Sequence, residues 1–291
     1  MTEFAKLHAL GNDFLVLRLP DNSGCQVSLP ALTRALCDRH TGVGADGTVF
    51  YHPTVGDSEA GYSVLIFNSD GSRAEMSGNG IRCLAAHLVH SGAVRSGLVQ
   101  LRSVAGIRSL LLKAARSPEY VFEAAMGHPI TDPARIPAAV GSRQAAIVGQ
   151  PLEVAGQSIR VTLSSMGNPH CTTFWERVDD APVETLGPLL EKSECFPGRT
   201  NVEFAQVVDR HTLQVRFWER GAGPTLSSGT GSSAAAVAAV LNGFVDSPVR
   251  VITELGFLEV DWEPGRELRL TGPATVVCSG RYVSREPGTV Q

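Results

Sequence analysis

The sequence predicts an α+β protein made of two similar domains, and three observations lead to this prediction. Short runs that alternate between apolar and polar residues recur along the 291 residues, which is typical of β-strands. Two glycine-rich loops each run directly into an alanine-rich apolar segment, which is typical of a buried helix. These loops belong to sequence matches that lie about 150 residues apart, and such a repeat indicates a duplicated unit.

The repeat consists of three short matches that occur in the same order in both halves. They pair residues 10–12 with 166–168, residues 67–71 with 217–221, and residues 77–80 with 228–231. We therefore expect two pseudo-symmetric domains, residues 1–124 with 274–291 and residues 125–273, with the active site in the cleft between them. Each domain is expected to contain a strand, a turn, a glycine-rich loop and a buried helix in this order.

In the first half, local patterns predict two helices among short strands. Residues 4–19 alternate around the turn signal at residues 11–13, which predicts two strands. Apolar residues at helical spacing predict a helix over residues 30–40, with Leu32, Leu36 and Cys37 facing inward. A second helix is expected to follow the first glycine-rich loop, over residues 79–91. Further strands are expected at residues 48–51 and 62–67, and a meander at residues 98–123.

In the second half, the same patterns predict a helix over residues 183–192 and another after the second glycine-rich loop. Prolines punctuate residues 129–137, so the domain crossing is placed near Ala125. Strands are expected at residues 145–154, 157–164, 171–175, 204–208, 212–218, 249–253, 257–262, 267–271 and 274–283. The last of these is expected to return to the first domain.

Composition narrows the function classes. The net charge of −4 argues against nucleic acid or an anionic membrane as a partner. No stretch reaches the roughly 20 apolar residues of a membrane span, and the first residues show no apolar core of a signal peptide. The six cysteines are scattered without metal-ligand spacing, which favours reduced thiols in a cytoplasmic protein and predicts no metal site.

The two glycine-rich loops are suited to hold an anion. The first turn of a helix carries unpaired N–H donors and a partial positive charge, and glycine lets the backbone approach a ligand closely. Facing helix starts would therefore present a carboxylate with the N–H groups of Gly78, Asn79, Gly229 and Thr230. Such donors favour removal of the proton next to the carboxylate, because negative charge then develops on its oxygens.

Ser77 and Ser228 stand at equivalent positions just before the two helices. Inversion at the carbon needs a base on one face and an acid on the other, so these positions are candidates for the two proton carriers. A thiol would suit this task, since a helix N-terminus lowers its pKa. A serine hydroxyl is a far weaker acid.

The chain resembles the diaminopimelate epimerase family over nearly its whole length. The motifs that carry the resemblance are HALGNDF (8–14), GVGADG (42–47), FNSDGS-x-x-EM-x-GNGIRC (67–83), MGNPH (166–170), NVEF (201–204) and ERGAG-x-T-x-x-x-GTG (219–231). The family is a cofactor-independent isomerase family that interconverts LL- and meso-diaminopimelate in lysine and peptidoglycan biosynthesis. The resemblance implies two domains, each a curled mixed β-sheet around a central α-helix, and a homodimer that needs no pyridoxal phosphate.

The resemblance also implies roles for particular residues. His170 and Glu219 would tune the acid and base, and Glu219 with Arg220 would hold the distal amino-acid end of the substrate. Gly78, Asn79, Gly229 and Thr230 would hold the reacting carboxylate. The remaining polar groups of the substrate would be bound by asparagines, namely Asn12, Asn68, Asn168 and Asn201.

One feature departs from the family pattern, because the resemblance implies cysteine where this chain has Ser77 and Ser228. The chain keeps six other cysteines, so it has not been stripped of thiols. Four readings follow from the serines. They relay protons slowly with His170 and Glu219 as the bases, or the scaffold runs a related isomerisation or dehydration with one of these residues as base. Otherwise the protein binds an amino acid without changing it, or is a variant inactivated by Cys-to-Ser changes.

Overall fold

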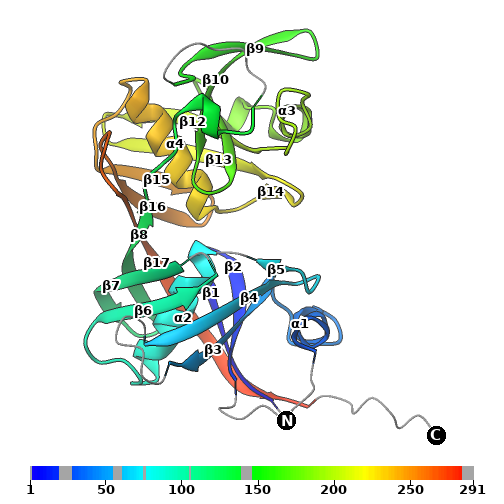
Figure 1. Cartoon of the computed structure of the whole chain (residues 1–291), viewed down its shortest axis with the longest axis vertical. Helices are drawn as coiled ribbons and strands as arrows, with labels where there is room; N and C mark the ends of the chain where they lie inside the picture. The colour runs from blue at the N-terminus through cyan, green and yellow to red at the C-terminus, as the bar shows by residue number, and fades with distance from the viewer. Residues whose placement is uncertain are drawn as a thin grey trace, which may run out of the picture. The chain divides into compact units, whose positions relative to one another are not determined.

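A computed structural model describes residues 2–19, 28–54, 61–74, 77–104, 106–138 and 146–283 (Figure 1). The chain divides into two compact units, residues 1–124 with 273–291 and residues 125–272. The boundaries fall inside two strands, β8 (Glu119–Gly127) and β17 (Leu268–Tyr282). No helix in the described ranges has the length and hydropathy needed to cross a membrane.

The first unit is a mixed sheet in which each strand pairs with a defined neighbour. β1 pairs antiparallel with β2, β2 pairs parallel with β3, and β3 pairs antiparallel with β4. β4 continues antiparallel to β5 and parallel to β6, and β6, β7 and β8 form a meander. The strands are β1 (Thr2–Ala9), β2 (Asn12–Arg18), β3 (Gly47–Pro53), β4 (Tyr62–Asn68), β5 (Arg73–Ala74), β6 (Leu98–Ser103) and β7 (Gly106–Arg116).

The second unit repeats this order of pairings. β10 pairs antiparallel with β11, β11 parallel with β12, and β12 antiparallel with β13. β13 continues antiparallel to β14 and parallel to β15, and β15, β16 and β17 form the meander. The strands are β9 (Gln150–Val154), β10 (Gln157–Ser165), β11 (Pro169–Phe174), β12 (Asn201–Asp209), β13 (Thr212–Glu219), β14 (Gly223–Thr225), β15 (Val249–Thr253) and β16 (Gly256–Asp261). The predicted duplication of the strand–loop–helix unit is therefore confirmed.

Each unit wraps its sheet around one central helix, α2 (Gly78–His90) in the first and α4 (Gly229–Leu241) in the second (Figure 1). Both helices are buried over most of their length, and α4 buries an unbroken run of small residues from position 231 to 239. Small side chains allow the strands to pack closely against the helix on all sides, which explains the alanine-rich segment. Two further helices, α1 (Leu29–Cys37) and α3 (Val183–Glu191), cover the sheets, and short 3₁₀ turns lie at Pro133–Arg135 and Val178–Asp180.

The α+β class and the central helices were predicted, whereas several boundaries differ; β12, for example, begins at Asn201 and not at residue 204. The helix expected over residues 30–40 ends at Cys37, because the Asp38 carboxylate accepts hydrogen bonds from the backbone of His40 (2.8 Å) and Thr41 (2.6 Å). The strand expected from residue 145 begins at Gln150, and residue 145 lies outside the described ranges. The strands expected at 267–271 and 274–283 are one continuous strand, β17, which pairs with β16 and then with β1.

Candidate active site

The first glycine-rich loop places Ser77 at the N-terminus of α2. Ser77 has an extended backbone (φ −141°, ψ 114°), and its Oγ accepts a hydrogen bond from the backbone N–H of Gly80 at 3.0 Å. This arrangement is a helix N-cap, which satisfies one of the first-turn donors. The N–H groups of Gly78 and Asn79 have no acceptor within the helix, so they remain donors for an anion.

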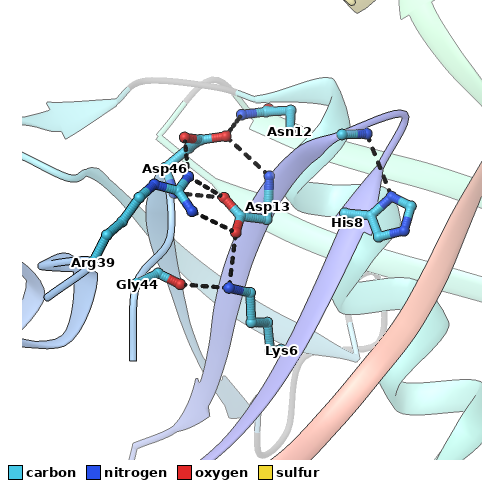
Figure 2. A network of polar contacts seen from close by, with 8 residues as sticks. Lys6, His8, Asn12, Asp13, Arg39, Gly44 and Asp46 are labelled. Carbon is cyan, nitrogen blue, oxygen red and sulfur yellow. Dashed lines mark hydrogen bonds and ion pairs between the residues drawn. The ribbon is translucent and has the colours of Figure 1, made fainter. Parts of the chain in front are cut away.

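Two of the predicted binding residues in this unit are joined directly. The Asn79 side chain donates from Nδ2 to Asn12 Oδ1 at 3.0 Å, and Asn12 donates from Nδ2 to Asp46 Oδ2 at 2.9 Å. Because Asp46 can only accept, the orientation of the Asn12 amide is fixed. Figure 2 shows that Asn12 and Asp46 belong to a larger polar network.

This network is held by the parallel pairing of β2 and β3, which sets Phe14 opposite Gly47 and so brings Asp13 beside Asp46. Asp13 is bound by Arg39 (3.0 Å) and Lys6 (3.0 Å), and Arg39 also reaches Asp46 at 2.8 Å (Figure 2). Burial disfavours the charged Asp13 carboxylate, but the hydrogen bonds from Arg39 and Lys6 outweigh burial and hold its pKa below the usual value. The two acids of this cluster are therefore paired with the two cations.

Asn68 lies apart from this network within its own turn. Its Nδ2 donates to Ser72 Oγ at 3.0 Å, and the side chain is exposed. The turn is tied to the network through the backbone, where the Ser69 N–H donates to the carbonyl of Asp46 at 2.9 Å. The structure thus leaves the outer surface of Asn68 open to solvent.

The second unit repeats the capped helix start. Ser228 has an extended backbone (φ −139°, ψ 124°), and its Oγ accepts from the backbone N–H of Gly231 at 3.2 Å. Gly231 packs so closely that an added Cβ would lie 2.8 Å from the Phe217 ring. Gly229 and Thr230 occupy the first helical positions, where their N–H groups have no acceptor within the helix.

His170 is fully buried between two polar partners. Its Nδ1 lies 2.6 Å from Glu203 Oε1, and its Nε2 lies 3.0 Å from Asn168 Oδ1. A carboxylate only accepts, so Nδ1 carries a proton and the ring is held in one orientation. Thr172 donates to the other carboxylate oxygen of Glu203 at 3.2 Å. The parallel pairing of β11 and β12 sets Thr172 opposite Glu203, as β2 and β3 align the acidic pair of the first unit.

Asn201 links the strand end to the ERGAG loop. Its Nδ2 donates to the Pro169 carbonyl at 2.9 Å, and its Oδ1 accepts from the Arg220 backbone N–H at 3.0 Å. The Arg220 guanidinium donates to the Gly198 carbonyl at 3.0 Å and is otherwise exposed. Both amide ends of Asn201 are therefore engaged with the backbone, which positions Arg220.

Glu219 is the one predicted acid whose pKa is perturbed upward in this unit. Burial raises its pKa, and the hydrogen bond that Thr225 Oγ1 donates to Glu219 Oε1 at 2.7 Å opposes this shift only in part. A carboxyl with a raised pKa keeps its proton to higher pH than an exposed carboxyl does, which is a feature of general acids and bases.

The sequence analysis did not predict several residues that contribute to the site. Asp46, Glu203 and Arg82 lie inside motifs that had been identified, but only the fold shows what they contact. Glu191 lies outside these motifs. It is the last residue of α3, is 2% exposed, and accepts from Gly221 N (2.8 Å) and Trp218 Nε1 (2.9 Å). No sequence signal marked it, because these partners lie about 30 residues away, on β13 and in the turn that follows it.

Comparison with known proteins shows which family the sequence matches. Residues 4–131 and 162–277 match the family model described as diaminopimelate epimerase. A diaminopimelate epimerase of Pelotomaculum thermopropionicum is 41% identical over 282 residues, which cover 97% of this chain and 99% of that protein. Diaminopimelate epimerase 1 of Nostoc sp. is 44% identical over 286 residues, which cover 96% and 99%.

Solved structures share the fold at low sequence identity. A probable proline racemase from Agrobacterium radiobacter has a TM-score of 0.69 at 15% identity and covers 99% of this chain and 94% of its own. A PhzF-family phenazine biosynthesis protein from Bacillus anthracis has a TM-score of 0.69 at 14% identity and covers 97% and 99%. These likenesses agree with the duplicated architecture described above.

Proposed function

The chain belongs to the diaminopimelate epimerase family, and we propose that it interconverts LL- and meso-diaminopimelate by proton transfer at Cα. The observation that carries the proposal is the pair of capped helix starts at Ser77 and Ser228, which occupy equivalent places in a chain that matches the family in both halves. Inversion at one carbon needs two proton carriers, and the duplicated unit supplies one from each half.

The proposed carboxylate ligands are the N–H groups of Gly78, Asn79, Gly229 and Thr230. When the α-proton leaves, negative charge moves onto the carboxylate, so these donors bind the transition state more strongly than the substrate. Asn12, Asn68, Asn168, Asn201, Glu219 and Arg220 are proposed to bind the remaining polar groups of the substrate.

The proposed proton path runs through the serines to stronger bases. One hydroxyl takes the α-proton while passing its own proton to a base, and the other face receives a proton in the reverse manner. His170 and Glu219 are the proposed bases, and the raised pKa of Glu219 supports this role. The path requires no pyridoxal phosphate and no metal.

We further propose that both halves act on one substrate molecule in a cleft between the two domains, residues 1–124 with 274–291 and residues 125–273. The active species is proposed to be a cytoplasmic homodimer that serves lysine biosynthesis. Light scattering on the purified chain tests the assembly, and a mass equal to one chain would contradict it.

The deciding experiment is proton NMR in D₂O with LL- and meso-diaminopimelate. The expected result is loss of the α-proton signal together with appearance of the other stereoisomer. Retention of the α-proton while calorimetry shows binding would reject the epimerase. It would support a second candidate, an amino-acid-binding protein without turnover, which is favoured by the two serines at the proton-carrying positions.

A further inference from the structure

Arg82 is a buried cation that has no role in the reaction proposed above. It lies on α2, its side chain is fully buried, and its Nε and Nη1 atoms have no hydrogen-bond partner within the described ranges. Among the residues that the structure describes, no acidic side chain forms an ion pair with it. Burial lowers the pKa of Arg82 to about 10, so the guanidinium remains charged at neutral pH.

The guanidinium lies at the start of the helix. Side chains of a helix lean toward its N-terminus. Arg82 follows this direction, and its Nη2 donates to Oδ1 of Asn79 in the first turn. Arginine can only donate, so the carbonyl end of the Asn79 amide faces Arg82 and its Nδ2 faces Asn12. The positive charge is therefore hydrogen-bonded to the side chain of Asn79, a residue whose backbone N–H is one of the first-turn donors of α2.

Among the described residues, the two acids of the polar network that contains Asn12 are engaged by other cations. Asp13 is bound by Lys6 and Arg39, and Asp46 is bound by Arg39 (Figure 2). The helix of the second unit has a small polar residue, Ser233, at the position matching Arg82 in the repeat. A buried charge without a counter-charge is costly to stability, so packing alone does not account for this arginine.

We propose that Arg82 is the buried counter-charge for a substrate carboxylate bound at the start of α2, and that it positions the Asn79 amide for that carboxylate. This proposal takes the identity of the substrate from the proposed function. The expectation that an anion binds beside Arg82 does not depend on the proposed function. Arg82 acts through Asn79 and through its field, and it is a positioning residue rather than a catalytic one. The charge strengthens the helix-start donors at the point where the enolate-like carboxylate gains charge.

The test compares Arg82→Met, Arg82→Lys and a matched control, Arg95→Met. Methionine fills similar space without charge, lysine keeps the charge without the planar fork of donors, and Arg95 is an exposed arginine of the same unit. Calorimetry measures binding of meso-diaminopimelate and of its diamide, which lacks both carboxylates. Urea unfolding measures stability.

Arg82→Met is expected to weaken diaminopimelate binding about 10- to 100-fold, the range for a hydrogen-bonded charge. Its urea midpoint should not fall, because a buried unpaired charge is removed. Arg82→Lys should recover part of the affinity, and Arg95→Met should bind as wild type. Diamide affinity should be the same in wild type and Arg82→Met. Equal diaminopimelate affinity in these two proteins would overturn the proposal, as would a parallel loss of diamide binding and stability.

A second probe separates this proposal from the proposed function. Acetate is titrated while the backbone amide signals of Gly78 and Asn79 are followed by NMR. Saturable shifts in wild type that are lost in Arg82→Met support the counter-charge even if diaminopimelate does not bind, in which case the proposed function alone fails. A wild type that responds to neither acetate nor diaminopimelate would overturn both.

Discussion

Restoring thiols at the two helix starts tests the proposed chemistry most directly. The double substitution Ser77→Cys with Ser228→Cys places a sulfur where each hydroxyl now caps a helix. The two sites share the same extended backbone, and their Oγ atoms accept from Gly80 at 3.0 Å and Gly231 at 3.2 Å. The substitution therefore changes the proton carrier at two equivalent places without requiring a new backbone conformation.

The structure predicts a loss of stability from this change. Sulfur is a weak acceptor, so each substitution removes most of a capping hydrogen bond, which costs about 0.5–2 kcal/mol per cap. The two helices lie in different units, so their losses should add to about 1–4 kcal/mol. Urea unfolding of the single and double variants measures this additivity.

The same change should increase activity. A thiol at a helix N-terminus has a lowered pKa, and positioned acid–base groups contribute about 10²–10⁴-fold each. We therefore expect α-proton exchange in D₂O to accelerate at least about 100-fold in the double variant, with a smaller gain in each single variant. Activity would thus rise while stability falls.

Ser227→Cys is the matched control, since Ser227 is buried beside Ser228 but caps no helix. Its exchange rate should equal that of the wild type. An unchanged exchange rate in a folded double variant would refute the reasoning, because it would mean that the serines do not limit proton transfer.

Three further predictions concern the second unit. Glu203→Leu should cost about 1–3 kcal/mol in urea unfolding, because it leaves the buried Nδ1–H of His170 without its acceptor, whereas Glu203→Gln should cost less. Equal costs would show that this hydrogen bond does not stabilise the fold. Glu219 has a raised pKa in the folded protein, so its contribution to stability is present below its ordinary value of 4.5 and is lost as pH rises through the folded pKa. Glu219→Gln should therefore be more stable than wild type at neutral pH and equal to it in acid, and a difference independent of pH would argue against the shift. Gly231→Ala should lower stability by about 1–3 kcal/mol because its Cβ meets the Phe217 ring, whereas Gly80→Ala, whose nearest contacts are 3.3 Å, should cost less in the same thermal unfolding assay.

The elements and the repeat could be predicted from sequence because their signals are local. Strand alternation and the glycine-to-alanine transitions are carried by residues close together in the chain. The continuity of β17 was missed because Gly272 and Pro273 resemble a break. The strand passes through them since it pairs with β16 at residues 269–271 and with β1 at residues 275–282, and neither register includes the glycine–proline step.

The polar contacts around the candidate site could not be predicted in the same way. Asn12 and Asp46 meet only because β2 and β3 pair in parallel, and Glu203 reaches His170 only because β11 and β12 do so. Parallel register depends on a crossover connection of many residues, so no short window of sequence encodes it. Asp46 and Glu203 lie within the motifs, but the motifs do not predict which residues they contact.

The strand β17 also has a consequence for the order of folding. The second unit is one continuous segment, residues 125–272, whereas the first unit needs residues from both sides of it. The outer partner of β1 is residues 275–282, so the first sheet stays incomplete on the ribosome until the second unit has been synthesised. Shortening the chain before residue 275 would expose the edge of β1 as an unpaired strand, with the attendant risk of aggregation, while leaving every residue of the second unit in place.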